Sequence, residues 1–277
     1  FLLISCTKNE IPNQNLSASG LIDSISTNNY PASIKFYYDN QGRVDSIIKG
    51  TVLHRFYYNT SSLTPYKHTD STISPTNSSI ALIKTLYLTF DTEGRLLRDS
   101  GSSYNRNLLT NEIYNFTPTI GNVNAYSYGS GFRVISKPEI PSTVDSLFYD
   151  LDGNAVRSYR GPSLIFISNF LEHYPFENPF RKLNICNVNI DKLKIFEYYG
   201  EDPVWLSKYF PKKFRSWNSL YYIIEQDEQT ETNILNCQFN SSNQLTSVTV
   251  AITRYSSNPP YNILDSGSYT SQFYYHP

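Results

Sequence analysis

Hydrophobic and polar residues alternate along much of the chain from about residue 21 onward. The alternation is clearest in residues 33–38, 85–90 and 247–253, where an aliphatic or aromatic side chain occupies every second position. A period of two, with β-branched and aromatic residues, predicts strands that bury one face and expose the other. Such half-buried strands favour an antiparallel sheet, because parallel sheets are usually covered on both faces.

A short motif recurs four times within this pattern. It consists of an aromatic residue, Asp or Asn, two polar residues, Gly or Asn, one further residue and an aliphatic residue, which comes one position later in the third copy. Asp and Asn open turns by bonding to the backbone two residues ahead, and Gly or Asn accepts the positive φ of a tight turn. Each copy therefore predicts the turn of a β-hairpin. The copies are Tyr38–Val44, Phe90–Leu96, Tyr149–Val156 and Phe239–Leu245.

Two segments depart from the strand pattern. Residues 163–173 fit a short helix as well as a strand, and residues 203–210 fit one or two helical turns that begin at Pro203 and stop before Pro211. The predicted fold is mainly β: a single antiparallel, hairpin-rich twisted sheet of meander-like order, with one or two short helices. No linker divides it, so residues 21–277 are expected to form one domain.

The first residues resemble the end of a bacterial lipoprotein signal peptide. An apolar run, Phe1–Ile4, is followed by Ser5 and Cys6, and Leu3-Ile4-Ser5-Cys6 resembles a lipobox. In lipoproteins the signal peptide is removed before the cysteine, whose thiol then carries diacylglycerol. The resemblance implies that residues 1–5 are the residual end of a signal peptide and that residues 6–20 are a lipidated cysteine with a flexible tether. A buried first strand that contains a cysteine is the alternative.

The turn motif and the lipobox together resemble the YD-type hairpin repeats of Bacteroidota envelope proteins, and a group of small lipoproteins of unknown function. Lys8-Asn9-Glu10 loosely resembles the surface-export signal of Bacteroidota lipoproteins, although Asn9 stands where an acid is usual. The resemblance implies an outer-membrane lipoprotein held by acyl chains on Cys6, on the periplasmic or the cell-surface face. Because the four copies begin at irregular positions, a single finite sheet is expected rather than a long repeat array.

Composition excludes several other classes of protein. The formal net charge is −1 and charged residues make up 17% of the chain, so no basic surface for nucleic acid is expected. Aromatic residues reach 15%, enough for a packed core. No segment has the spacing of a zinc site or of a nucleophile motif, and His54 is expected to face solvent. The sequence therefore predicts no catalytic residue, no cofactor and no metal site.

One cluster of aromatic residues is a candidate for binding. It surrounds Pro211-Lys212-Lys213, and exposed aromatic rings beside cations suit stacking on sugars or docking of a protein. Packing of the same rings in the core is the alternative. Cys186 and Cys237 fall on the apolar phase of two predicted strands, as core thiols or as a disulfide pair. The candidate binding residues are Trp205, Tyr209, Phe210, Phe214 and Trp217.

The functional expectation follows from these features. It is an acyl-anchored cell-envelope lipoprotein that acts as a non-enzymatic binding or accessory module, for a glycan or for an outer-membrane protein. A polysaccharide-active hydrolase and a purely structural envelope component are the two alternatives. The chain is expected to reach the membrane only through the acyl chains on Cys6, and the sequence does not define its oligomeric state.

Overall fold

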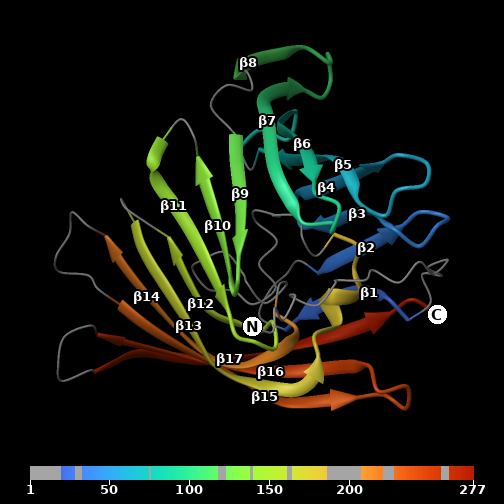
Figure 1. Cartoon of the computed structure of the whole chain (residues 1–277). Coiled ribbons are helices and arrows are strands. Elements are labelled where there is room, and N and C mark those ends of the chain that lie inside the picture. The colour runs from blue at the N-terminus through green and yellow to red at the C-terminus, as the bar shows by residue number, and fades with distance from the viewer. Residues whose placement is uncertain are drawn as a thin grey trace.

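The computed structural model describes residues 20–28, 33–74, 76–117, 123–137, 140–160, 164–185, 207–220, 228–256 and 262–277. Within these ranges the chain forms almost only strands (Figure 1), with one 3-10 helix, η2 (Pro179–Lys182). The strands are β1 (Ile22–Thr27), β2 (Ile34–Tyr38), β3 (Val44–Lys49), β4 (Val52–Tyr58), β5 (Pro65–Ile73), β6 (Ile80–Phe90), β7 (Leu96–Asn107), β8 (Ile113–Thr117), β9 (Val123–Gly129), β10 (Phe132–Lys137), β11 (Ile140–Tyr149), β12 (Ala155–Arg160), β13 (Leu164–Glu177), β14 (Tyr209–Leu220), β15 (Glu228–Phe239), β16 (Leu245–Ser256) and β17 (Ile263–Tyr275).

The described strands form a closed antiparallel barrel. Each strand pairs with the next around the ring, except that β7 pairs with both β8 and β9. The first strand closes the ring, because β1 pairs with β2 on one side and with β17 on the other. Sixteen strands complete this circle, and β8 stands outside it as an extension of β7, at the top of Figure 1.

This closure corrects the predicted open, meander-like sheet. The order of neighbouring strands does follow the chain, but pairs such as Ile25 with Phe273 join its two ends. Closure removes the two sheet edges that an open sheet would leave unpaired. The two segments predicted as possible helices are strands where the structure describes them. Residues 164–173 belong to β13, and Tyr209 and Phe210 are the first residues of β14. Residues 203–206 lie outside the described part of the chain.

The four motif copies form one and the same turn. In the first copy Asp39 accepts hydrogen bonds from the backbone N–H groups of Gln41 and Arg43, and Gly42 has a φ of 72°. Asp91, Asp150 and Asn240 accept the equivalent pair of bonds in the other copies. The positive φ is taken by Gly94, Gly153 and Asn243. An L-residue with a Cβ tolerates this conformation poorly unless it is Asn or Asp, which explains the motif.

Each turn is followed by a register shift that places one small or aliphatic residue inside the barrel. Val44, Leu96 and Leu245 take this position, and each is at most 2% exposed. In the third copy the position belongs to Ala155, which is fully buried, and not to Val156 as the motif predicts. The returning strand therefore begins at the same point in all four copies.

All four turns lie at the end of the barrel where the described chain begins and ends. The N–H of Gly20 donates to the carbonyl of His276, and the N–H of His276 donates to the carbonyl of Leu21. Because neighbouring strands run in opposite directions, the segments that join β5 to β6 and β16 to β17 lie at the other end. We call the first end the turn end and the second the loop end.

The interior of the turn end is filled with apolar side chains. They come from strands all around the ring, and they pack around the segment after η2, where Phe180, Leu183 and Ile185 are at most 2% exposed. The Phe180 and Phe273 rings lie 6.1 Å apart, so this segment contacts the barrel wall. The members of this floor include Ile25, Phe36, Val44, Ile47, Phe56, Leu96, Phe210, Ile234, Val248 and Phe273.

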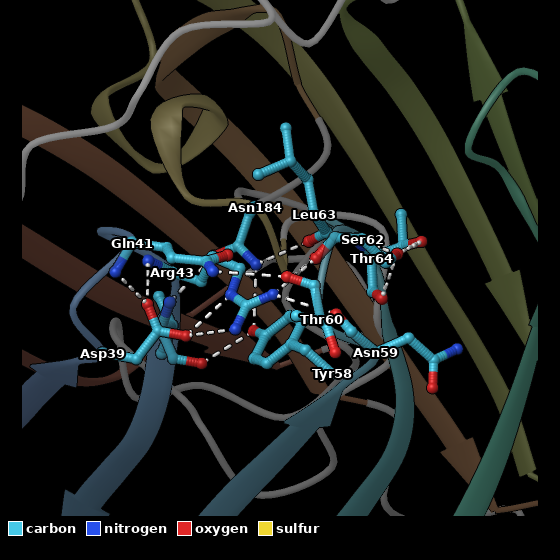
Figure 2. A network of polar contacts seen from close by, with 11 residues as sticks. Asp39, Gln41, Arg43, Tyr58, Asn59, Thr60, Ser62, Leu63, Thr64 and Asn184 are labelled. Carbon is cyan, nitrogen blue, oxygen red and sulfur yellow. Dashed lines mark hydrogen bonds and ion pairs between the residues drawn. The ribbon is translucent and has the colours of Figure 1, made fainter.

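A buried asparagine, Asn184, joins the segment after η2 to the strands by hydrogen bonds (Figure 2). Asn184 accepts a hydrogen bond from the N–H of Val44 at 3.0 Å. Its amide donates to the hydroxyl of Tyr58 at 2.9 Å and to the carbonyl of Leu63 at 2.8 Å. Arg43, from the first turn, donates to the carbonyl of Ser62 in the same network. One side chain thus joins the floor to three places on β3, β4 and the turn after β4.

The outer face of the described strands carries both charged and aromatic residues. Lys35, Arg55 and Arg98 are exposed on it, and so are Tyr37, Tyr87 and Tyr274. Glu231 forms ion pairs there with Lys213 and Arg215 at 3.0 and 2.7 Å. Burial opposes the ionisation of Glu231, but its bonds to Arg215, Asn233 and Lys213 lower its pKa to about 2. The described residues also include no helix long and apolar enough to cross a membrane.

We predict that Asn184→Ala destabilises the fold by about 2 kcal/mol, because it leaves the buried N–H of Val44 without its acceptor. The measurement is urea unfolding followed by tryptophan fluorescence. Asn40→Ala, at an exposed position of the first turn, is the matched control and is expected to change stability by less than about 0.5 kcal/mol. Equal effects of the two substitutions would show that Asn184 does not anchor the floor.

Candidate functional site

The inner face of the barrel changes character between its two ends. On β17, alternate residues are buried from Tyr269 to Phe273, whereas every residue from Ile263 to Ser268 is exposed. On β6, Leu86 and Leu88 are buried on the inner face, but Leu82 on the same face is 44% exposed. The described strands therefore surround an open cup at the loop end, above the apolar floor.

The cup is lined mainly by hydroxyl and amide side chains. Thr72, Leu82 and Asn105 lie on one rung of β5, β6 and β7, and Ser103 follows one rung below beside Lys84. Across the ring, Thr230 and Thr232 on β15 pair with Arg254 and Ile252 on β16, but both threonine side chains are buried. On β5 to β7 the lining therefore combines hydroxyl and amide groups with the exposed side chain of Leu82.

Three ionisable side chains converge at the boundary between the cup and the floor. His54 on β4 and His68 and Asp70 on β5 are 0%, 1% and 4% exposed. The Nδ1 atom of His54 lies 2.6 Å from Oδ1 of Asp70 and 3.2 Å from Nε2 of His68. The His68 ring stacks between the rings of His54 and Phe56, with centroids 5.4 and 4.8 Å away. We call these three residues the His-Asp cluster.

The strand register produces this cluster. In the antiparallel pair of β4 and β5, His54 lies opposite Asp70 and Phe56 lies opposite His68. His68 and Asp70 are two residues apart on one strand, so both face the interior. Closely spaced rings and a carboxylate follow from this geometry without any special backbone conformation.

A second buried carboxylate lies on β7. Asp99 is 2% exposed and accepts hydrogen bonds from the Tyr126 hydroxyl and from the Asn124 amide. Burial raises the pKa of Asp99 above its usual value, although these two bonds and the positive charge of Lys84 act in the opposite direction. Lys84 also lies opposite Asp70 in the β5–β6 ladder. A line of charged groups therefore runs along the inner wall from Asp70 past Lys84 to Asp99.

Among the described residues, a small hollow lies at the turn end. Its volume is about 160 Å³, and it is lined by residues of β1, η2 and the β15–β16 turn, among them Phe176, Lys182, Asn243 and Tyr275. Ligand pockets usually measure about 300–1,000 Å³. The cup is therefore the better candidate for a binding site.

The predicted binding aromatics do not form one described surface. Phe210 is fully buried and stacks on Phe176 at 5.6 Å, so it belongs to the floor. Tyr209 is half-buried at the start of β14, and its backbone N–H donates to Oδ1 of Asn154. Phe214 and Trp217 lie on β14, but their side chains are outside the described part of the structure, as is the whole of Trp205.

The predicted lipidation site, Cys6, and Cys186 also lie outside the described residues. Cys237 is a half-buried free thiol on β15, and burial raises the pKa of this thiol.

Two histidines also lie where the sequence does not show them. His173 forms a hydrogen bond with the backbone of Ala155, whereas tyrosine hydroxyls donate to the backbone carbonyls at the equivalent positions Val44 and Leu96. Burial lowers the pKa of His173. His54, predicted to face solvent, lies instead in the interior.

Comparison with known proteins gives limited information. No family description matches the sequence, and no curated protein does. A porin-like protein from Bacteroides uniformis resembles the structure with a TM-score of 0.48 and 9% identity, over 96% of this chain and 100% of that one. A porin-like protein from Bacteroides vulgatus does so with a TM-score of 0.41 and 8% identity, over 93% and 99%. At these values no residue role passes from those proteins to this chain.

Sequence analysis missed the His-Asp cluster because its members are not close in a motif. The available signal is His68-Thr69-Asp70, a pair of ligand-type residues on one face of a strand, with His54 fourteen positions earlier. Their meeting depends on the length of the connection at residues 59–64, which sets the register of β4 against β5. No composition or spacing rule fixes that register.

We predict that the stability of the wild-type protein falls as the pH rises above about 4, relative to Asp99→Asn. The reason is that the folded state holds a proton on Asp99 that the unfolded state has already released. Urea unfolding at pH 4, 6 and 8 measures the difference. Tyr126→Phe removes a bond that lowers this pKa, so it should extend the loss of stability to higher pH and increase its total size. A difference that does not change with pH would contradict the assignment.

Proposed function

We propose that this protein is an acyl-anchored, non-enzymatic envelope module that binds a polar ligand of the carbohydrate class in its cup. The observation that carries the proposal is the asymmetry of the barrel: an apolar floor fills the turn end, and a cup lined by hydroxyl and amide groups opens at the loop end. Groups of this kind hydrogen-bond the hydroxyls of sugars, and a single apolar side chain such as Leu82 offers a surface for a ring.

The filled floor argues against a channel. A conducting barrel has a polar lumen that is open to water along its length, whereas Ile47, Phe56 and Phe180 are at most 2% exposed inside this barrel. The outer face carries exposed Lys35, Arg55 and Arg98 among its tyrosines, and in this proposal it is in contact with water. The barrel serves in this proposal as a rigid support for the cup.

The position of the chain ends supports an orientation. Gly20, the first residue that the structure describes, joins the turn end through its bond to His276. If Cys6 carries the acyl chains, the turn end faces the membrane and the cup faces away from it. An outer-membrane location, on the periplasmic or the cell-surface side, is part of this proposal. Acyl chains hold such a domain because each buried CH₂ contributes about 0.8 kcal/mol.

We predict that Cys6→Ser moves the protein from the membrane fraction to the soluble fraction, because the acyl chains provide its hold on the bilayer. Fractionation of the producing cells and immunoblotting measure this. Cys237→Ser is the matched control and should leave the protein on the membrane. A Cys6→Ser protein that stays on the membrane and resists alkaline washing would contradict both the anchor and the water-facing outer face.

We also predict that a panel of polysaccharides contains one that retards the protein in affinity electrophoresis. Asn105→Ala and Leu82→Ala, both on the cup rung, should each weaken the retardation at least about tenfold, the loss expected for one polar or apolar contact. Tyr87→Ala removes an exposed ring from the outer face of β6 and should leave retardation unchanged. Sensitivity to Tyr87→Ala alone would place binding on the outer face, and failure of every polysaccharide would overturn the carbohydrate assignment.

A further inference from the structure

The His-Asp cluster places three possible metal ligands against one another in the buried interior. The Nδ1 atom of His54 faces two groups at once, Oδ1 of Asp70 at 2.6 Å and Nε2 of His68 at 3.2 Å. If this nitrogen carries a proton, Asp70 and an unprotonated Nε2 of His68 must share it. If it carries none, it presents a lone pair to the carboxylate. A hydrogen bond is strongest when the donor points at a single acceptor, so no tautomer of His54 gives both contacts a full hydrogen bond.

Charging both rings does not resolve the conflict. An imidazolium group has a proton on each nitrogen, so Nδ1 of His54 and Nε2 of His68 would place two donors 3.2 Å apart with no acceptor between them. The Nε2 atom of His54 also has no hydrogen-bond partner among the described residues, so no acceptor there favours a second proton.

A metal ion satisfies all three donor atoms together. The two imidazole nitrogens and a carboxylate oxygen lie within 4.8 Å of one another. Ligands that bind one ion at about 2.0–2.2 Å are about 3–3.5 Å apart, close to the 3.2 Å between His54 and His68. We infer that His54, His68 and Asp70 bind a divalent transition-metal ion of the zinc class, through Nδ1, Nε2 and a carboxylate oxygen respectively.

The ligand types select among metals. Two imidazoles and one carboxylate suit zinc and its neighbours in the first transition row, whereas Ca²⁺ and Mg²⁺ prefer sets made only of oxygen. Three protein ligands leave at least one position for water, and the cup above the cluster can supply it. The site would join β4 to β5 at the top of the apolar floor, with Phe56 packed beneath the His68 ring.

Nearby charges set the strength of the site. The ion adds two positive charges, Asp70 offsets one, and Lys84 faces Asp70 from β6. Removing the Lys84 charge should therefore tighten metal binding, an effect that a purely structural role of the histidines does not predict.

The test uses the full-length chain and zinc chloride as the probe. Isothermal titration at pH 7.5 should show one zinc ion per chain, and zinc at 100 times its dissociation constant should raise the melting temperature by roughly 5–10 °C. Equal concentrations of CaCl₂ and MgCl₂ should give neither effect. Zinc affinity should fall as the pH drops from 7.5 to 6, because the histidines must lose their protons to bind.

Variants separate the cluster from adventitious binding. His68→Phe keeps the stacked ring and Asp70→Asn keeps the size of the side chain, and each should reduce zinc affinity at least about 100-fold. Lys84→Met should increase it, and His276→Gln, near the exposed C-terminus, should not change it. If wild-type protein binds no zinc, or if His68→Phe and Asp70→Asn fold and bind it unchanged, the assignment is wrong. Loss of binding in His276→Gln alone would also overturn it.

Discussion

Burial of apolar side chains inside a closed ring of strands is the interaction on which the rest of this structure depends. The ring closes because β1 pairs with both β17 and β2, and the side chains that face inward at the turn end then share one core. The segment after η2 passes through this core, with Asn184 meeting the polar groups of Val44, Tyr58 and Leu63. With the turn end filled in this way, the barrel keeps an open inner surface only at the loop end.

The apolar floor also limits where charged and ionisable side chains can lie. On the outer face, charged residues meet water or one another, as Glu231 does with Lys213 and Arg215. On the inner face, the ionisable residues collect where the floor ends and the cup begins, at His54, Asp70 and Asp99. Buried ionisable groups are costly unless they have partners. Because these ionisable residues lie together on one part of the inner wall, this boundary is the best candidate for a site that binds an ion or a proton.

Local features of the fold follow from the sequence, and distant pairings do not. The Asp or Asn that opens each turn motif forms the expected bonds, and the Gly or Asn that follows takes the expected positive φ, because these residues act within five positions. Closure depends on Ile25 meeting Phe273, for which the sequence carries no local signal, so the open sheet was the wrong prediction. The same limit applies to the cluster: His54 alternates as a strand residue should, but only the β4–β5 register shows that its face is inward and that Asp70 lies opposite.

Two neighbouring positions on β17 test the central claim most directly, because Ser271 is fully buried inside the barrel and Gln272 is exposed outside it. In a membrane-attached chain with Cys186 and Cys237 replaced by serine, Ser271→Cys and Gln272→Cys are each treated with a water-soluble maleimide. A filled barrel with a water-facing exterior predicts rapid labelling of Gln272→Cys and protection of Ser271→Cys. Labelling of Ser271→Cys, with Gln272→Cys protected until detergent is added, would contradict this account and indicate a water-filled lumen inside a lipid-facing wall.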